Sequence, residues 1–401
     1  MIQKRRLTVV EKIMLKRRAT ERARKGYPIL VLEDFVKEPK LAEGTMIQCI
    51  DEHKKFVAIA YLAKQNKGDG WILTTNQTEM INQNFYERLF KEAMDQRSIF
   101  KLNEQTTAYR VFNGEGDGLG GLTIDFYDGY YVFSWYSKGI YTHRDLILKA
   151  FQAVVTDSNG IYEKIRFETN AKPETDLIFG KSAPEPLVIL ENGIKYATYL
   201  DDGLMTGVFL DQRDVRQSLL EKYAMGKTVL NTFSYTGAFS VAAALGGAVE
   251  TTSVDLAKRS LPKTVEQFVL NNLNIDDHVV RVMDVFDYFK YAIRHKLAFD
   301  VVVVDPPSFA RSKKRTFSAA KDYASLLEEV IQLTKPKGII VASTNAANVT
   351  TEKFKGFIEE AFKNQNKSYT IEETFTLPDD FKINPEFTQG DYLKVFIIRK
   401  K

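Results

Sequence analysis

The sequence predicts an α/β protein in which a Rossmann-like C-terminal domain with a mainly parallel sheet follows a small β-rich domain and a central α+β domain. Its 401 residues exceed a single core of ordinary size and suit two or three domains. In the second half of the chain, short apolar β-branched runs alternate with helical stretches, as in a parallel sheet covered on both faces. In the first half, strand-like runs follow one another closely with few helical stretches between them.

The first predicted domain spans residues 1–75 and begins with a basic segment. Residues 1–26 carry ten Lys or Arg and two Glu, a net charge of +8, whereas the rest of the chain sums to −4. A basic patch of this density is typical of phosphate binding, and an amphipathic helix with Val10, Ile13 and Met14 facing inward is the equally weighted alternative. β-rich runs then indicate a small barrel-like module: Tyr27–Leu32, Thr45–Cys49, Phe56–Tyr61 and Trp71–Thr74.

The second predicted domain spans residues 76–187 and mixes helices with strands. A helix from about Thr78 to Arg97 and another near His143–Val155 come before a strand near Ile161–Glu168. The first helix places its apolar side chains on one face: Ile81, Phe85, Leu89, Phe90 and Ala93. Residues 171–187 contain three prolines and are expected to be a linker.

Two turns of this domain carry clear signals. Asp128-Gly129 lies between the strand-like runs Leu122–Tyr127 and Tyr130–Tyr136, and predicts a tight hairpin because a type I′ turn needs positive φ. The glycine-rich stretch Gly114–Gly121 has the composition of a phosphate-binding loop, but it has no lysine, and its Glu and Asp would repel an anion. We therefore expect a structural turn there.

The third predicted domain spans residues 188–401 and alternates strands with helices. The expected strands are Thr228–Thr232, Thr251–Val254, Val279–Val282, Val301–Val304 and Ile339–Ala342. The expected helices are Ala238–Leu245, Arg259–Leu273, Asp287–His295 and Tyr323–Leu333. The uncharged run 228–249 has about the length of a membrane span, but its polar residues and glycines indicate a buried strand, turn and helix instead.

Polar residues lie where these strands end. The first strand runs from Asn231 into Phe233-Ser-Tyr-Thr-Gly237 and a helix, whose free N–H groups and glycine would admit a ligand. Asp255 ends the second strand, where an acidic side chain can accept hydrogen bonds from ribose hydroxyls. Asp284 ends the third strand, and Asp305-Pro306-Pro307 ends the fourth. Because ligands of doubly wound folds bind outside the carboxyl ends of the strands, these residues predict one ligand site.

The pattern favours S-adenosylmethionine over a nicotinamide dinucleotide. A dinucleotide enzyme usually has three glycines opening the first helix, where they seat a pyrophosphate. Here only Gly237 is in place. A ligand with ribose and adenine but without a phosphate fits better, and a nicotinamide-dependent Rossmann enzyme stays the first alternative.

Several of these runs resemble one enzyme family. NTFSYTGAFSVAAALGGA and VVVVDPPSFARSKK are similar to the class I S-adenosylmethionine-dependent 23S ribosomal RNA methyltransferases that have an N-terminal PUA domain, a central β-β-α-β-β-type domain and a C-terminal catalytic domain. FNGEGDGLGGLTIDFYDGYYV resembles the middle domain of this family, GVFLDQRDVR the segment before the first catalytic strand, and DYLKVFIIRK the last strand, so the similarity covers nearly the whole chain. The resemblance implies a PUA-like first domain, a seven-stranded catalytic sheet, S-adenosylmethionine as cofactor with S-adenosylhomocysteine as product, and ribosomal RNA as partner.

The resemblance also implies roles for particular residues. Those expected at the cofactor are Gln212, Arg213, Asn231, Phe233, Ser234, Tyr235, Thr236, Gly237, Asp255, Leu256, Asp284 and Val285. Arg213 would face the carboxylate of the cofactor, because a guanidinium pairs with it bidentately. Those expected at the target base are Asp305, Pro306, Pro307, Phe309 and Asn345. RNA contacts are expected from Arg5, Arg6, Lys16, Arg17, Arg18, Lys313 and Lys314.

One departure from the family pattern concerns a catalytic cysteine. Members that methylate C5 of cytosine add a cysteine thiolate to C6 of the base, and that cysteine follows the fifth strand. Asn345 stands there in this sequence, and the sole cysteine, Cys49, lies in the first domain. A ring nitrogen such as guanine N7 already has a lone pair. Guanine, or another position that needs no cysteine, is therefore favoured over cytosine C5, and C5 methylation by another mechanism remains an alternative.

Composition limits the remaining possibilities. One cysteine allows no intramolecular disulfide, and four widely spaced histidines predict no metal site. Neither a secretory signal nor a membrane span is expected, so the expected compartment is the cytoplasm, with a monomer or homodimer as the expected state. A catalytically inert RNA-binding assembly factor is the alternative from another functional class, and the intact acidic residues count against it.

Overall fold

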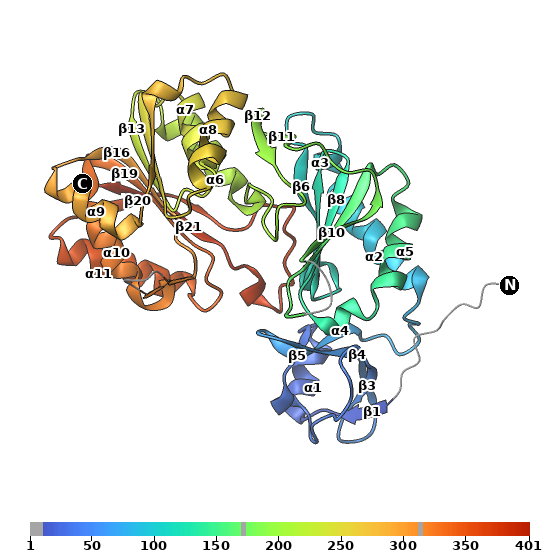
Figure 1. Ribbon diagram of the computed structural model, residues 1–401. Coiled ribbons are helices and arrows are strands. Elements are labelled where there is room, and N and C mark those ends of the chain that lie inside the picture. Colours follow the sequence, from blue (N-terminus) through green and yellow to red (C-terminus); the bar gives the residue numbers. More distant parts are fainter. Residues whose placement is uncertain (1–10, 170–173, 312–315) are drawn as a thin grey trace. The chain divides into compact units, whose positions relative to one another are not determined.

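The computed structural model describes residues 11–169, 174–311 and 316–401 (Figure 1). The predicted RNA contacts Arg5, Arg6, Lys313 and Lys314 lie outside these ranges. The chain forms two compact units that are not contiguous in sequence. The first holds the described residues up to Leu187 together with Tyr199–Thr206 and Asp379–Gly390, and the second holds Val188–Thr198, Gly207–Pro378 and Asp391–Lys401.

The N-terminal part of the first unit is a five-stranded sheet with the order β1-β3-β4-β5-β2. Its elements are β1 (Glu11–Met14), α1 (Arg17–Arg24), β2 (Ile29–Leu30), β3 (Met46–Ile50), β4 (Phe56–Gln65) and β5 (Gly68–Thr74). The helix considered for Ile13 and Met14 is wrong, because β1 pairs in parallel with β3. Ile13 and Leu15 are buried and Lys12 is exposed, and this period of two favours a strand.

The central part of the first unit is a second five-stranded sheet with the order β10-β9-β8-β7-β6. Its strands are β6 (Ala108–Asn113), β7 (Leu122–Tyr127), β8 (Tyr130–Trp135), β9 (Gly160–Ile165) and β10 (Thr175–Gly180), and its helices are α2 (Gln83–Gln96), α3 (Ser98–Lys101), α4 (Lys138–Tyr141) and α5 (Arg144–Val154). Asp128 and Gly129 have φ values of 42° and 93°, which confirms the predicted hairpin. The predicted linker is wrong in part, because Thr175–Gly180 pairs with β9 as the edge strand of this sheet. None of its residues is fully buried, so it needs only a short apolar run, and such a run is hard to recognise as a strand in the sequence.

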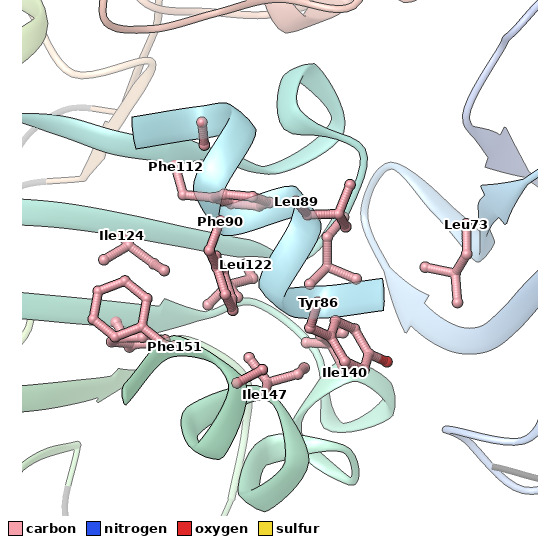
Figure 2. Packing of buried hydrophobic residues seen from close by; sticks show 14 of the residues in the cluster. Leu73, Tyr86, Leu89, Phe90, Phe112, Leu122, Ile124, Ile140, Ile147 and Phe151 are labelled. Carbon is pink, nitrogen blue, oxygen red and sulfur yellow. The ribbon is translucent and has the colours of Figure 1, made fainter. Parts of the chain in front are cut away.

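Helices α2 and α5 pack together against this sheet (Figure 2). The predicted apolar face of α2 is buried throughout. Phe90 lies at its centre, with its ring centroid 5.3 Å from that of Phe112 and 5.3 Å from that of Phe151. A contiguous aromatic core therefore supports the sheet.

The second unit is built on a seven-stranded sheet with the order β15-β14-β13-β16-β19-β21-β20. Only β21 runs antiparallel to its neighbours, so the predicted mainly parallel sheet is confirmed. Its strands are β13 (Thr228–Thr232), β14 (Glu250–Asp255), β15 (His278–Val282), β16 (Phe299–Val304), β19 (Thr334–Thr344), β20 (Tyr369–Phe375) and β21 (Lys394–Lys400). Two hairpins accompany it: β11 (Leu187–Glu191) with β12 (Ile194–Thr198), and β17 (Phe309–Arg311) with β18 (Thr316–Ser318).

Helices cover both faces of this sheet (Figure 1). They are α6 (Arg213–Ser218), α7 (Ala238–Leu245), α8 (Ser260–Leu270), α9 (Val285–Arg294), α10 (Ala319–Leu333) and α11 (Thr351–Asn364). Helices α6, α7 and α8 belong to one side and α9, α10 and α11 to the other. Strand β16 is buried on both faces, which explains its unbroken valine run.

A late segment of the chain, Asp379–Gly390, belongs to the first unit. The buried Arg97 pairs with Asp117 at 2.7 Å and donates to the backbone oxygen of Asp380 at 2.8 Å. The carboxylate of Asp380 accepts from the backbone N–H of Arg110 at 2.8 Å. The predicted C-terminal domain thus contributes a segment that completes the core of the other unit.

Candidate active site

Most of the predicted site residues lie at the ends of five neighbouring parallel strands, β15, β14, β13, β16 and β19. Thr232 of β13 pairs with Val254 of β14 and with Val304 of β16, and Val304 pairs with Ala342 of β19. The residues that come next in each strand therefore share one edge of the sheet. This edge is where doubly wound folds bind their ligands.

The loop after β13 has a strained backbone. Phe233, Tyr235 and Gly237 have φ values of 53°, 52° and 80°. A non-glycine residue in the left-handed region costs on the order of 1–3 kcal/mol and usually persists at functional sites. At Gly237 an added Cβ would lie 2.5 Å from Cγ2 of Thr264, so glycine is required at the start of α7.

Two side-chain hydrogen bonds hold this loop in place. One oxygen of the Asp255 carboxylate accepts from the backbone N–H of Tyr235 at 2.9 Å, and the other accepts from the backbone N–H of Ala257 at 2.8 Å. The hydroxyl of Thr236 donates to the backbone oxygen of Gly207 at 2.6 Å. Each carboxylate oxygen of Asp255 keeps a second lone pair for a ligand hydroxyl.

Leu256 directly follows β14, and Asp284 comes two residues after the end of β15. The carboxylate of Asp284 caps α9, accepting from the backbone N–H groups of Phe286 at 3.0 Å and Asp287 at 3.3 Å. Val285 is buried beneath this cap. Leu256 is 55% exposed, so it offers an apolar surface beside Asp255.

A hydrogen-bonded cluster lies beside the loop. The side-chain nitrogen of Gln212 donates to Asp305 at 3.1 Å and to the hydroxyl of Ser343 at 2.8 Å. Burial, with help from the charge of Asp211, raises the pKa of Asp305 to about 6. The amide oxygen of Gln212 and the hydroxyl of Ser234 are buried and have no hydrogen-bond partner within the described part of the chain. Buried polar atoms of this kind call for a partner that a ligand can provide.

The segment after Asp305 exposes an aromatic side chain. Pro306 is buried, Pro307 is exposed, and Phe309 of β17 is 62% exposed. Ser308 donates to the side-chain oxygen of Asn345 at 2.6 Å, so the segment after β16 contacts the segment after β19. An exposed phenylalanine beside polar side chains suits the stacking of a planar group.

The remaining predicted residues have the following positions and contacts. The amide of Asn231 is buried and donates to Ser240 at 3.0 Å, where it fastens β13 to α7. Arg213 is buried at the start of α6, 3.6 Å from the carboxylate of Asp214. Lys16, Arg17 and Arg18 are exposed at the start of α1, in the first unit.

A buried ion pair supports the site, and the sequence did not predict it. Arg216 of α6 contacts Glu191 of β11 through two hydrogen bonds of 2.6 and 2.7 Å, and both side chains are almost fully buried. Arg216 also donates to the backbone oxygen of Phe209 at 2.7 Å. The charged residues of Gly207–Arg216 indicated that this segment takes part in the site. The partner of Arg216, Glu191, lies on the hairpin of β11 and β12, which the sequence analysis did not predict.

Two further features bear on function. Among the ranges described, no group of three or more His, Cys, Asp or Glu side chains is arranged to hold a metal ion. Helices in the same ranges are all too short or too polar to cross a membrane.

Known proteins match the chain over most of its length. A family model described as S-adenosylmethionine-dependent methyltransferase matches residues 153–397, and a PUA-like domain model matches residues 13–75. The chain is 52% identical over 394 residues, 97% of this chain and 99% of the relative, to "Putative ribosomal RNA large subunit methyltransferase YwbD" of Bacillus subtilis. It is 33% identical over 334 residues, 82% of this chain and 84% of the relative, to "Ribosomal RNA large subunit methyltransferase I" of Aeromonas salmonicida.

Solved structures agree with this match. A structure described as a putative S-adenosylmethionine-dependent methyltransferase from Streptococcus mutans superposes with a TM-score of 0.90 at 44% identity, over 97% of this chain and 100% of the other. A second, described as a putative methyltransferase complexed with SAH, gives a TM-score of 0.91 at 45% identity with the same coverage. The predicted enzyme class and cofactor are confirmed. The chain belongs to the family of S-adenosylmethionine-dependent methyltransferases that carry a PUA-like domain before the catalytic domain.

Proposed function

We propose that this enzyme methylates a base of 23S ribosomal RNA, and that the base is a guanine, with N7 as the atom methylated. The relatives at 52% and 33% identity are named as ribosomal RNA large subunit methyltransferases, which supports RNA as substrate. We assign RNA binding to residues 1–75 and catalysis to residues 188–401, with residues 76–187 between them. The choice of base rests on Asn345, which the segment after β19 presents hydrogen-bonded to Ser308. By the family resemblance, cytosine C5 chemistry would need a thiolate at this position.

The loop after β13 fits the cofactor. We propose that Phe233–Gly237 holds its methionine part, together with Gln212 and Arg213, because the unpartnered polar atoms of Ser234 and Gln212 lie there. Asp255 would accept hydrogen bonds from the ribose hydroxyls. Leu256, Asp284 and Val285 would enclose the adenine. When bound, S-adenosylmethionine supplies an electrophilic methyl group on a sulfonium.

At the proposed place of the target base, the chain provides the carboxylate of Asp305 and the exposed rings of Pro307 and Phe309. Guanine N7 carries a lone pair, so its methylation needs orientation rather than covalent activation. The product base is cationic, and the ionised carboxylate of Asp305 would stabilise the positive charge as it develops. The exposed Pro307 and Phe309 would support the base by stacking, and the buried Pro306 would hold the segment beneath them.

Nucleoside mass spectrometry of ribosomal RNA tests the proposal. Cells that lack the protein should lack one 7-methylguanosine, and the purified enzyme should restore it on their RNA. Restoration of 5-methylcytidine, or of no methylated nucleoside, would overturn the proposed base or the proposed substrate.

Asp255→Ala is expected to weaken the binding of S-adenosylhomocysteine by at least about tenfold. The variant loses ribose hydrogen bonds to a charged acceptor, worth about 1.5–3 kcal/mol, and tenfold corresponds to about 1.4 kcal/mol. It also releases the backbone N–H of Tyr235. Calorimetry measures the dissociation constant, with Asp276→Ala, an exposed aspartate before the start of β15, as a surface control. An unchanged constant in the folded variant would exclude the ribose role.

Cys49→Ser is expected to keep methyl transfer unchanged. Cys49 is fully buried in β3, and burial raises the pKa of its thiol to about 12, so almost no thiolate forms at neutral pH. An RNA substrate with 5-fluorocytosine should form no covalent adduct with either protein. Adduct formation that depends on Cys49 would contradict both the site and the proposed base.

Charge reversal at Lys16 and Arg18 is expected to weaken RNA binding and flatten its salt dependence. Both side chains are exposed and have no ion pair with another described residue, whereas Arg17 pairs with Glu21 at 3.1 Å. The logarithm of the binding constant falls linearly with the logarithm of the salt concentration. Each lost phosphate contact should make this negative slope shallower by about 0.7 for single-stranded RNA. Lys363→Glu, an exposed cation on α11, is the control. If the double variant keeps the slope of the wild type, α1 does not bind phosphates.

A further inference from the structure

The hydrogen bond between Ser308 and Asn345 joins two loops at the substrate side of the sheet edge. The donor is the Ser308 hydroxyl and the acceptor is the Asn345 side-chain oxygen, 2.6 Å apart. Both residues are exposed. A bond between exposed neutral groups contributes about 0.5–1.5 kcal/mol at most, so the fold does not depend on it. Its consequence is the orientation of the amide.

The two loops are held in position from beneath. The hydroxyl of Tyr323 in α10 donates to the backbone oxygen of Ser343 at 2.6 Å and to that of Val304 at 3.3 Å. It thereby joins the ends of β16 and β19, the two strands that lead to Ser308 and Asn345. Pro306 and Pro307 fix φ at two of the three positions between Val304 and Ser308. The pair therefore rests on a preorganised base rather than on mobile loops.

We infer that Ser308 orients Asn345 so that the amide nitrogen donates to an acceptor on the target base, and that this contact selects guanine over adenine. The inference rests on the proposed methylation of a purine. Asparagine usually pairs with adenine through both ends of its amide: the amide oxygen accepts from the 6-amino group, and the amide nitrogen donates to N7. Here the Ser308 hydroxyl already donates to Oδ1 of Asn345, so the amide nitrogen, with its two N–H donors, is left for the ligand. Guanine presents O6 as an acceptor on that edge, and the lone pair of its N7 stays free to receive the methyl group, whereas adenine presents a donor at position 6.

Ser308 is a positioning residue in this scheme, since it acts through Asn345. Without the Ser308 hydroxyl, the side-chain amide of Asn345 can flip and present its oxygen to the base. The turned amide accepts from a 6-amino group. Loss of Ser308 is therefore expected to relax base selection, which a merely structural role would not do.

The test uses the full-length enzyme and an RNA substrate with one purine replaced at the methylated position. Guanine is compared with 2-aminopurine, which lacks O6, and with 2,6-diaminopurine, which has an amino group in its place. All three keep N7. The wild type should favour guanine over both analogues by at least about tenfold in kcat/KM.

Ser308→Ala should reduce this preference at least about fivefold, and Ser308→Thr, which keeps the hydroxyl, should restore it. Asn345→Asp replaces the donor by an acceptor and should shift the preference towards 2,6-diaminopurine. Ser368→Ala, an exposed serine before β20, is the matched control and should leave the preference unchanged.

The outcomes separate the two proposals. If the wild type methylates no guanine at N7, the proposed function fails. If it methylates guanine and Ser308→Ala retains the full preference, only the role of Ser308 and Asn345 is overturned. A relaxed preference that Ser308→Thr restores supports the inference.

Discussion

Asp305→Asn is expected to lower the turnover number by about a hundredfold or more while raising the melting temperature of the cofactor-free protein. Loss of a preorganised group that stabilises transition-state charge costs about 10²–10³ in rate. The KM for RNA should change less, because the charge develops only as the methyl group moves. In the wild type, turnover should fall as the pH drops below about 6, where Asp305 takes up a proton.

The gain in stability follows from the same pKa. Burial makes the folded protein hold this proton more tightly than the unfolded chain, so the free energy of unfolding falls as the pH rises from the unfolded pKa to about 6 and stays lower above it. At neutral pH the charge costs on the order of 2–3 kcal/mol, at 1.36 kcal/mol for each pKa unit. Asparagine keeps the acceptor for Gln212 and removes the charge.

Asp300 provides a matched control at the other end of β16. Burial would raise its pKa, but hydrogen bonds from Lys335 and Thr228 outweigh burial and lower the pKa to about 2. Asp300→Asn should therefore lower the melting temperature at neutral pH and leave turnover unchanged. Steady-state kinetics and thermal melting at pH 5, 7 and 8 measure both variants. A loss of stability in Asp305→Asn, or equal turnover in the two variants, would contradict the assignment.

Arg216→Met is expected to destabilise the second unit by about 3–5 kcal/mol, because it leaves the buried carboxylate of Glu191 without its partner. Cofactor affinity should fall too, since Arg216 also holds the backbone oxygen of Phe209, three residues before Gln212. Removing both charges in Glu191→Leu with Arg216→Met should cost less than removing Arg216 alone. Thermal melting of the two single variants and the double variant gives the coupling. Purely additive losses would show that the pair is not coupled.

The sequence predicted the parts of the fold that depend on local pattern. The strand Thr228–Thr232 and the helix Ala238–Leu245 were predicted with the bounds that the structure gives them, because apolar β-branched runs and small helix formers differ clearly. Asp255 and Asp305 were placed at the ends of their strands for a related reason, because the β-branched run stops at each of them. These signals need no knowledge of distant contacts.

Other parts depend on partners far away in the sequence. Residues 11–14 form a strand only because β3 lies beside them, and Thr175–Gly180 forms one because β9 has a free edge. Arg216 pairs with Glu191, and Ser308 with Asn345, across 25 and 37 residues of the chain. The side-chain role of Asn231 was missed because its hydroxyl partner, Ser240, faces it across a helix–sheet interface.

The order of the catalytic sheet constrains how the protein is made. Strand β21 follows β20 in the chain but lies between β19 and β20 in the sheet. During translation, β19 and β20 therefore emerge from the ribosome before the strand that pairs with both. Until β21 arrives, each has an open edge that invites pairing with another chain. A nascent chain that stalls before Lys394 would expose two such edges at once, and would be a natural substrate for chaperones that bind unpaired strands.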